Sequence, residues 1–517
     1  MILIQEISYS GTNFTSVLTN RTTFLINASS NNVVFVLRIL VNLFVTPVCL
    51  NLFGVEIFGA YLFSFGLVTS LGFLDFGISK GILRFTAEYY RDNDIFKFEK
   101  ALSAGLIINL FTAGMAAVLM IALGANFNLF FNIDLAYAQV ASNLFFVSAA
   151  YAFGYFFSLM PLSILQGAQR FKERNMLQLI LLCLNGIAVG SLAYLKFSIV
   201  WFCGVNTIIS FIGIGFDLWL IKRLRLLQGI NFSVPSFRGL LESDFFKYSK
   251  RVFGLSTITM LSTQMDKVIL SVFGNVSLVA VYSVITKPYS LVKAIFMNAL
   301  VAMEPIIVSK SYNLIQLRSL IVRTTRISLS ILTPTLILII ILFNPIIRLW
   351  TQKDIFSTYT IWGVVSLVGL GIAFSYSIVY RTIYLSGHIG ELIKVERISS
   401  VLNGLVSLTA TFYLGVGGVI LGTFVQSIIN YFFLYRKSVV HFSIGQTQMF
   451  DWKFVLVFLV TIAEGIGLYL MDSYFLSGLG ELVVLLKFGI YFFVLLVPAA
   501  IYIWNEKLLL NHPLKFT

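Results

Sequence analysis

The chain has 517 residues, of which 58% are hydrophobic and only 11% are charged, and its formal net charge is +14. A soluble protein carries about 25% charged residues, so this composition excludes a soluble globular chain and indicates a surface that lies mostly in lipid. The three cysteines and three histidines are scattered. Their spacing excludes a disulfide framework and a metal site, and it gives little support to a histidine-dependent membrane enzyme.

The first segment, residues 1–30, is polar and lacks the basic start and cleavage site of a signal peptide. After it, fourteen windows are apolar over about 20 residues, the length that crosses a hydrocarbon core of about 30 Å. The sequence therefore predicts an all-α polytopic membrane protein. The predicted spans are 31–53, 56–78, 101–124, 137–161, 175–195, 198–221, 252–273, 279–304, 327–347, 358–380, 395–414, 416–435, 454–472 and 482–504.

The distribution of lysine and arginine between these spans predicts their orientation. With the N-terminus in the cytoplasm, 28 of the 36 basic residues lie on the cytoplasmic side and 3 on the outer side, counting Arg397 at a span edge with its loop. This asymmetry follows the positive-inside rule and predicts that both termini are cytoplasmic. The basic runs of the longest cytoplasmic loop, 222–251, then indicate contact with anionic lipid and not with nucleic acid.

Short motifs recur at a fixed distance in the two halves of the chain. GVEIFGAY ends at Tyr61 and GNVSLVAVY ends at Tyr282, an offset of 221, and each motif opens an equivalent span. The repeat predicts an N-lobe of six spans over 31–221 and a C-lobe of six spans over 252–436. Segment 437–517 adds two spans and a cytoplasmic C-terminus. Two-fold transporters of this kind place their pathway between the halves and use alternating access.

The first span carries a polar stripe. At 100° per residue, five side chains fall within about 80° of one another, namely Asn31, Arg38, Asn42, Thr46 and Cys49. An ionised side chain inside a span costs about 3 kcal/mol unless it meets water or a partner, so the stripe is predicted to line a cavity. The alternative is that Arg38 snorkels to the inner interface, which does not explain Asn42 and Thr46.

The eighth span contains two further cations. Lys287 and Lys293 lie about 120° apart around the helix, with Ser290 between them, so both can line one wide cavity. Lys287 is also shallow enough to snorkel to the outer interface, whereas Lys293 lies near the middle of the span. Pro288 removes a backbone hydrogen bond and is predicted to bend this helix.

Other ionisable residues in or beside the spans have less decisive surroundings. Asp266 and Lys267 are adjacent and point about 100° apart, so they cannot form a tight pair on one face of the helix. We predict that Asp266 faces inward, either as an ion-coupling acid or as a structural hydrogen-bonding group, and the direction of Lys267 stays open. Asp75 and Arg84 suit an interfacial cap or a local ion pair, and Glu464 is a weaker candidate for a proton site.

Three stretches carry a resemblance to a known family. They are FGVEIFGAYLFSFGLVTSLGFLDFGISKGILRFTAEYY (53–90), SILQGAQRFKERN (163–175) and QMDKVILSVFGNVSLVAVYSVITKPYS (264–290). They resemble the Wzx-like polysaccharide flippases, for O-antigen or capsule repeat units, of the multidrug/oligosaccharidyl-lipid/polysaccharide exporter superfamily. The resemblance implies a multi-pass protein of the bacterial inner membrane that moves a polyprenyl-diphosphate-linked oligosaccharide from the cytoplasmic to the outer leaflet by alternating access.

This resemblance also implies partners and roles. The implied partners are the lipid-linked oligosaccharide and membrane lipids, and a polysaccharide polymerase and chain-length proteins are further candidates. No cofactor is implied. The cations Arg38, Lys287 and Lys293 would then bind a diphosphate, assisted by the polar residues beside them, because arginine and lysine supply a fork and point charges for phosphate.

The driving force and the competing functions can also be weighed from the residues. No G-x-x-x-x-G-K-[ST] loop is present, so ATP hydrolysis is not expected. An anion moving outward gains about 2.3 kcal/mol per charge per 100 mV, so uniport suffices, and proton or sodium antiport would use Asp266. Fourteen spans also fit a peptidoglycan lipid-precursor flippase. A multidrug cation antiporter would need an acidic cavity, and a membrane polysaccharide polymerase would need a large outer loop or a cluster of acids or histidines.

Overall fold

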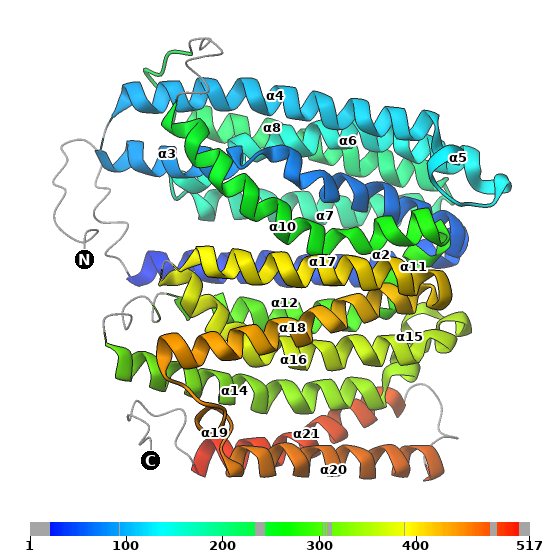
Figure 1. Cartoon of the computed structure of the whole chain (residues 1–517). Coiled ribbons are helices and arrows are strands. Elements are labelled where there is room, and N and C mark those ends of the chain that lie inside the picture. The colour runs from blue at the N-terminus through cyan, green and yellow to red at the C-terminus, as the bar shows by residue number, and fades with distance from the viewer. Residues whose placement is uncertain are drawn as a thin grey trace. The chain divides into compact units, whose positions relative to one another are not determined.

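The computed structural model of the chain describes residues 21–92, 94–232, 243–301, 303–304, 307, 313–386, 388–475 and 483–505. Over these residues the chain is helical and contains no strand (Figure 1). The predicted fold class, an all-α polytopic membrane protein, is confirmed. Residues 1–20 of the predicted N-terminal segment, 233–242 of the basic loop and 506–517 at the C-terminus lie outside the described residues.

The helices form two compact units. Unit 1 is Met1–Val268 with Asn275–Ser277, and unit 2 is Ile269–Gly274 with Leu278–Thr517. The helices of unit 1 are α2 (Arg21–Ser70), η1 (Leu71–Asp75), α3 (Ile78–Asp92), α4 (Ile95–Ala125), α5 (Phe127–Phe130), α6 (Leu135–Gly167), α7 (Phe171–Tyr194), α8 (Ile199–Arg223) and most of α10 (Asp244–Phe273).

The long α2 contains the first two predicted spans. They meet at Gly54, whose φ of 78° and ψ of 175° break the helix. This left-handed φ is one that glycine adopts readily and that strains other residues. Beyond the break, α4, α6 and α8 run side by side in unit 1 (Figure 1).

The end of unit 1 that carries α3 has its own apolar core. Ile82 and Phe85 on α3, Phe98 on α4, Ile164 on α6 and Phe245 on α10 are all buried in one cluster. The contact of Phe245 with this cluster explains why α10 belongs to unit 1 as far as Val268. The predicted lobes divide instead at the loop before this helix.

Unit 2 contains the remaining helices. They are α11 (Val276–Ile285, which begins at the unit boundary), α12 (Lys287–Val301), α14 (Leu314–Ile341), α15 (Phe343–Thr351), η2 (Asp354–Tyr359), α16 (Thr360–Leu385), α17 (Ile389–Leu414), α18 (Val416–Phe442), α19 (Gln446–Met449), α20 (Trp452–Phe475) and α21 (Val483–Asn505). Helices α11 and α12 meet at a bend of 51°, directly before Lys287 and Pro288, where the sequence predicts one.

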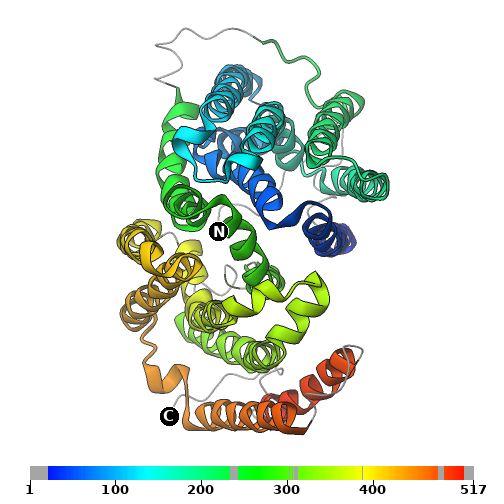
Figure 2. The same cartoon turned by 90° about the vertical axis from the view of Figure 1, so that its right-hand side faces the viewer.

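Two contacts determine how unit 2 packs. Gly422 on α18 lies so close to α17 that a Cβ atom there would be 2.0 Å from Ser407 Oγ. The hairpin of α20 and α21 packs against α14 and lies along one edge of unit 2 (Figure 2). Within this hairpin Lys487 Nζ lies 2.7 Å from Asp472 Oδ1, and Tyr491 donates a hydrogen bond to the same carboxylate.

The predicted spans fall on helical segments, but 56–78 runs from α2 through η1 to α3, 279–304 runs over α11 and α12, and 327–347 runs over α14 and α15. Among the described residues, ten helices are long and apolar enough to cross a membrane, or eleven if α11 and α12 form one bent span. The first of the ten, Val33–Asp75, holds two predicted spans in one continuous stretch. The chain is therefore a multi-pass membrane protein.

Candidate functional site

The polar stripe of the first span is a chain of hydrogen bonds along α2. Arg38 Nη2 donates to Gln178 Oε1 on α7 over 3.4 Å, Asn42 Nδ2 donates to the Arg38 carbonyl over 2.8 Å, and Thr46 Oγ1 donates to the Asn42 carbonyl over 2.9 Å. Arg38 and Asn42 are exposed. The guanidinium group has five donors, so most of its hydrogen-bonding capacity is available to a phosphate. The side chain of Asn31 lies outside the described residues.

Helix α7 adds polar groups that the sequence analysis missed. Arg174 lies close enough to Arg38 and to Asp217 on α8 to interact with both electrostatically. Further along α7, Asn185 donates to Asn206 on α8 over 2.6 Å, and Asn206 in turn donates to the hydroxyl of Tyr61 over 2.9 Å. The spacing of Arg174, Gln178 and Asn185 puts these side chains on one face of a helix, a signal that the sequence did contain.

The second group of predicted residues lies on α12 in unit 2. Lys293 Nζ donates to the hydroxyl of Tyr289 over 3.2 Å and lies 5.3 Å from the centre of that ring. Lys293 also interacts with the carboxylate of Glu396 on α17. Ser290 is exposed and donates to the carbonyl of Lys287 over 2.8 Å. The predicted cations thus fall into two groups, Arg38 in unit 1 and the two lysines in unit 2.

Asp266 and Lys267 have different surroundings, as their spacing requires. Asp266 is 5% exposed. The side chain of Lys267 runs over Gly66 of α2, where a Cβ atom would come within 3.1 Å of Lys267 Cδ. Lys267 is therefore packed against the backbone of a neighbouring helix.

The remaining predicted residues make local contacts. Asp75 accepts hydrogen bonds from the backbone nitrogen and the hydroxyl of Ser79 in the first turn of α3. Arg84 lies 2.7 Å from Glu88 in the next turn of α3, with its guanidinium over the ring of Tyr248. Glu464 on α20 has a buried carboxylate oxygen with no hydrogen-bond partner among the described residues.

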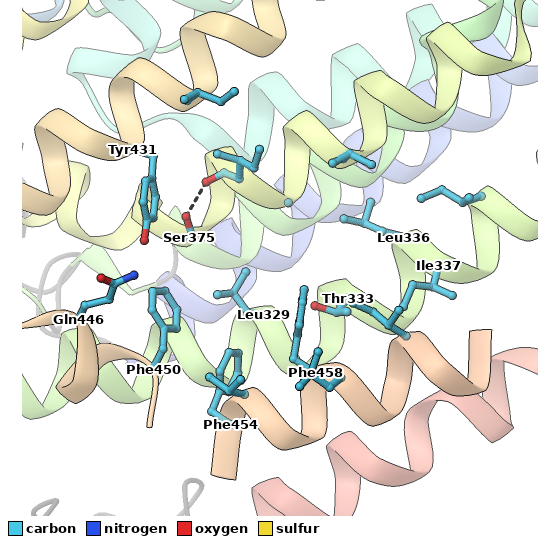
Figure 3. A pocket seen from close by; sticks show the side chains of 18 of the residues that line it. Leu329, Thr333, Leu336, Ile337, Ser375, Tyr431, Gln446, Phe450, Phe454 and Phe458 are labelled. Carbon is cyan, nitrogen blue, oxygen red and sulfur yellow. Dashed lines mark hydrogen bonds between the residues drawn. The ribbon is translucent and has the colours of Figure 1, made fainter. Parts of the chain in front are cut away.

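An apolar groove runs between α14, α16, α18, α19 and α20 of unit 2 and has a volume of about 850 Å³ (Figure 3). Phe450, Phe454 and Phe458 line it opposite Leu329 and Leu336 of α14. A second pocket of about 450 Å³ shares Ile337, Ile340 and Ile462 with it and continues to Tyr469. From Phe454 to Tyr469 the lining follows α20 for about 22 Å, most of a bilayer core.

Three of the few polar side chains of this groove are already paired within the protein. Ser375 Oγ donates to the carbonyl of Ile372 over 2.6 Å, and Tyr431 hydrogen-bonds the side chain of Gln446. Tyr431 and Gln446 lie together at one end of the groove (Figure 3). The rest of its surface is suited to a long hydrocarbon chain.

A charged clamp fixes the segment that closes this end of the groove. Arg326 of α14 is buried and lies 2.7 Å from Asp451, and its guanidinium also donates to the carbonyls of Gln448 and Met449. These residues belong to the connection that leads from α18 through α19 into α20. Because Gln446 and Phe450 of the same connection line the groove, Arg326 positions part of its wall.

The fold can now be compared with known structures. The chain is similar to the lipid II flippase MurJ in an inward closed conformation, with 17% identity and a TM-score of 0.72 over 92% of this chain and 98% of that one. It is also similar to an inward-facing multidrug resistance MATE family transporter of the MOP superfamily, with 15% identity and a TM-score of 0.63 over 78% of this chain and 94% of that one. The chain has the fold of these transporters.

A third similar structure is a MOP superfamily transporter from Pyrococcus furiosus, with 14% identity and a TM-score of 0.59 over 84% of this chain and 100% of that one. No protein-family model matches the chain, and no curated protein matches it in sequence. The helical fold of the chain thus has solved counterparts, all at low sequence identity.

Proposed function

We propose that the protein is a flippase that carries a polyprenyl-diphosphate-linked oligosaccharide from the cytoplasmic to the outer leaflet of a bacterial inner membrane. The observation that carries this proposal is the apolar groove walled by α20, because it offers a polyprenyl chain a continuous hydrocarbon surface. A polyprenyl chain is already surrounded by hydrocarbon in the bilayer, so the groove would hold it by shape and van der Waals contact and not by transfer from water.

The cations supply the complementary half of the substrate site. Arg38, Lys287 and Lys293 are proposed to bind the diphosphate during transport, with Asn42, Thr46 and Ser290 beside them. A headgroup with two negative charges moving outward against an inside-negative potential gains about 4.6 kcal/mol per 100 mV, so uniport is the proposed mode. Asp266 is the candidate for ion coupling if transport is coupled.

A peptidoglycan lipid precursor is a second candidate substrate. The similarity that favours it is with the lipid II flippase MurJ, which covers 92% of this chain, against 78% for the MATE family transporter. Both candidates are lipid-linked saccharides, so the groove serves either of them.

The test measures the sidedness of the lipid-linked oligosaccharide in cells. Arg38→Gln and Lys293→Gln are expected to reduce surface glycan at least tenfold at normal protein level, with lipid-linked units retained in the cytoplasmic leaflet. Lys394→Gln, which removes an exposed cation of α17, is the matched control and is expected to transport normally. Normal surface glycan in both Arg38→Gln and Lys293→Gln contradicts the proposed cationic site. If unpolymerised units are already in the outer leaflet, the protein acts as a polymerase and not as a flippase.

A further inference from the structure

Helix α16 carries a column of tyrosines to which the cation site and the groove assign no role. Tyr376, Tyr380 and Tyr384 recur every four residues, so their rings lie on one face of the helix. In a transmembrane helix, tyrosines are expected at the two interfaces with water. This column instead extends from Tyr384 at the end of α16 back to Tyr376 inside the bundle, so an interfacial position does not explain all three tyrosines.

The contacts of Tyr376 show that this face is directed into unit 2. Its hydroxyl hydrogen-bonds the side chain of Asn430 on α18, and it lies within electrostatic range of Glu396 on α17 and Tyr289 on α12. Tyr380 interacts with the same Glu396. A side chain that reaches three other helices faces the inside of the bundle and not the lipid.

Opposite charges also lie near this face. Lys293 bonds the hydroxyl of Tyr289 and interacts with Glu396, so a cation, a carboxylate and three phenols gather around one point. All of these side chains are only half-buried. They therefore remain accessible to a molecule that enters the unit.

Asn430 supplies an independent observation that points to a binding site. Asn430 is 5% exposed, and its side-chain oxygen accepts no hydrogen bond among the described residues. Its amide group donates to Tyr376, so the oxygen is an acceptor that still requires a donor. A buried acceptor left without a donor costs about 1–3 kcal/mol, so a sugar hydroxyl that this oxygen meets when the Asn430 side chain turns would be bound favourably.

We propose that Tyr376, Glu396 and Asn430, with Tyr289, Tyr380 and Lys293 around them, form a subsite for a pyranose sugar. Phenol rings pack against the C–H faces of a sugar ring, the carboxylate and the amide oxygen accept its hydroxyl protons, and the lysine donates to its oxygens. The subsite rests on the proposed flippase function, in which it holds a sugar of the lipid-linked oligosaccharide.

The internal repeat provides a related feature in unit 1. Tyr376 corresponds to Tyr155 of α6 at the same offset of 221 that relates the sequence motifs. Tyr155 lies beside Tyr151, with ring centres 6.2 Å apart. A phenol at this position is therefore present in both halves of the chain, although their other residues differ widely.

The experiment uses the full-length protein in lipid nanodiscs prepared without sugar-based detergent. Saturation-transfer NMR measures binding of the methyl glycosides of glucose, galactose, mannose, rhamnose and N-acetylglucosamine. The variants are Glu396→Gln, Tyr376→Phe and, as a control, Tyr413→Phe, which alters an exposed tyrosine at the far end of α17. Native mass spectrometry measures binding of undecaprenyl phosphate, which carries no sugar, to the same samples.

At least one glycoside is expected to bind the wild-type protein and the control. Its affinity is expected to fall about tenfold in Glu396→Gln, which replaces a charged acceptor by a neutral amide, and severalfold in Tyr376→Phe, which removes the hydroxyl that positions Asn430. Both variants conserve shape. Undecaprenyl phosphate is expected to bind all four proteins equally, which also shows that the variants are folded.

Two outcomes overturn the subsite, namely that no glycoside binds the wild-type protein or that binding is equal in all variants. If undecaprenyl phosphate binds in that case, the proposed lipid carriage stands and only the sugar subsite is wrong. If a glycoside binds as expected but undecaprenyl phosphate does not, the subsite stands and the carriage of a polyprenyl lipid is wrong.

Discussion

Replacement of Arg326 by glutamine tests whether the charged clamp holds the wall of the groove. The side chain of Arg326 is 7% exposed and that of Asp451 is 28% exposed, and the guanidinium also serves two backbone carbonyls. Removal of one partner of a buried ion pair typically costs 3–5 kcal/mol, and partial exposure of Asp451 places the expected loss near the lower limit. We expect Arg326→Gln to lower the free energy of unfolding by roughly 3 kcal/mol.

The assay is unfolding of the purified protein by titration with SDS in mixed micelles. The matched control is Arg348→Gln in the same unit, where Arg348 lies 3.0 Å from Asp354 but the two side chains are 64% and 75% exposed. An exposed pair of this kind contributes about 0–1 kcal/mol. Equal losses for the two variants would refute the reasoning. A double-mutant cycle with Asp451→Asn is expected to give a coupling energy of about 1–3 kcal/mol.

Two further predictions concern α17 and α18. Gly422→Ala is expected to lower the free energy of unfolding by about 1–3 kcal/mol, because the new Cβ would lie 2.0 Å from Ser407 Oγ. The control is Gly404→Ala in the same SDS titration. No atom lies within 4 Å of a Cβ at Gly404, so this variant is expected to be neutral or stabilising. At the start of α17, hydrogen bonds from Lys437 and a neighbouring histidine lower the pKa of Glu391 to about 2. A carboxylate with a depressed pKa stabilises the fold above its ordinary pKa of 4.5 and loses this effect as the pH falls toward 2. The melting temperature is therefore expected to fall between pH 4.5 and pH 2 more steeply in the wild-type protein than in Glu391→Gln, and parallel curves would contradict the assignment.

The sequence was sufficient to predict the helical class, because apolar length is a local signal. The predicted spans 252–273 and 395–414 lie on α10 and α17, which are not among the ten helices long and apolar enough to cross a membrane in the described part of the chain. The bend before Pro288 was also predictable, because a proline inside an apolar window is a local signal of a bent helix. The groove was not, because its apolar residues have the same composition as a lipid-facing surface, and only packing shows which of them meet. The link between Arg326 and Asp451 joins residues 125 positions apart, and no spacing rule relates them.

The candidate site was predicted in part. The residues of α2 and α12 were found because charges are rare inside apolar windows, and such windows single them out. Tyr376 and Asn430 were missed because tyrosine and asparagine are common in this chain and carry no charge. Their proposed role depends on three helices that approach one another in unit 2, which one-dimensional periodicity does not show. The direction of Lys267 was left open by the sequence, and the structure places it against Gly66.

The ion pair between Lys487 and Asp472 has a consequence for how the chain enters the membrane. A lysine or an aspartate costs about 2.5–3.5 kcal/mol at the centre of a helix that inserts alone and less near its ends, where Asp472 and Lys487 lie. The two residues neutralise each other only when α20 and α21 are both present, since each helix contributes one charge. The translocation machinery is therefore expected to release this C-terminal hairpin into the bilayer as one piece, after synthesis of α21, and a chain ended after α20 would be recognised by membrane quality control.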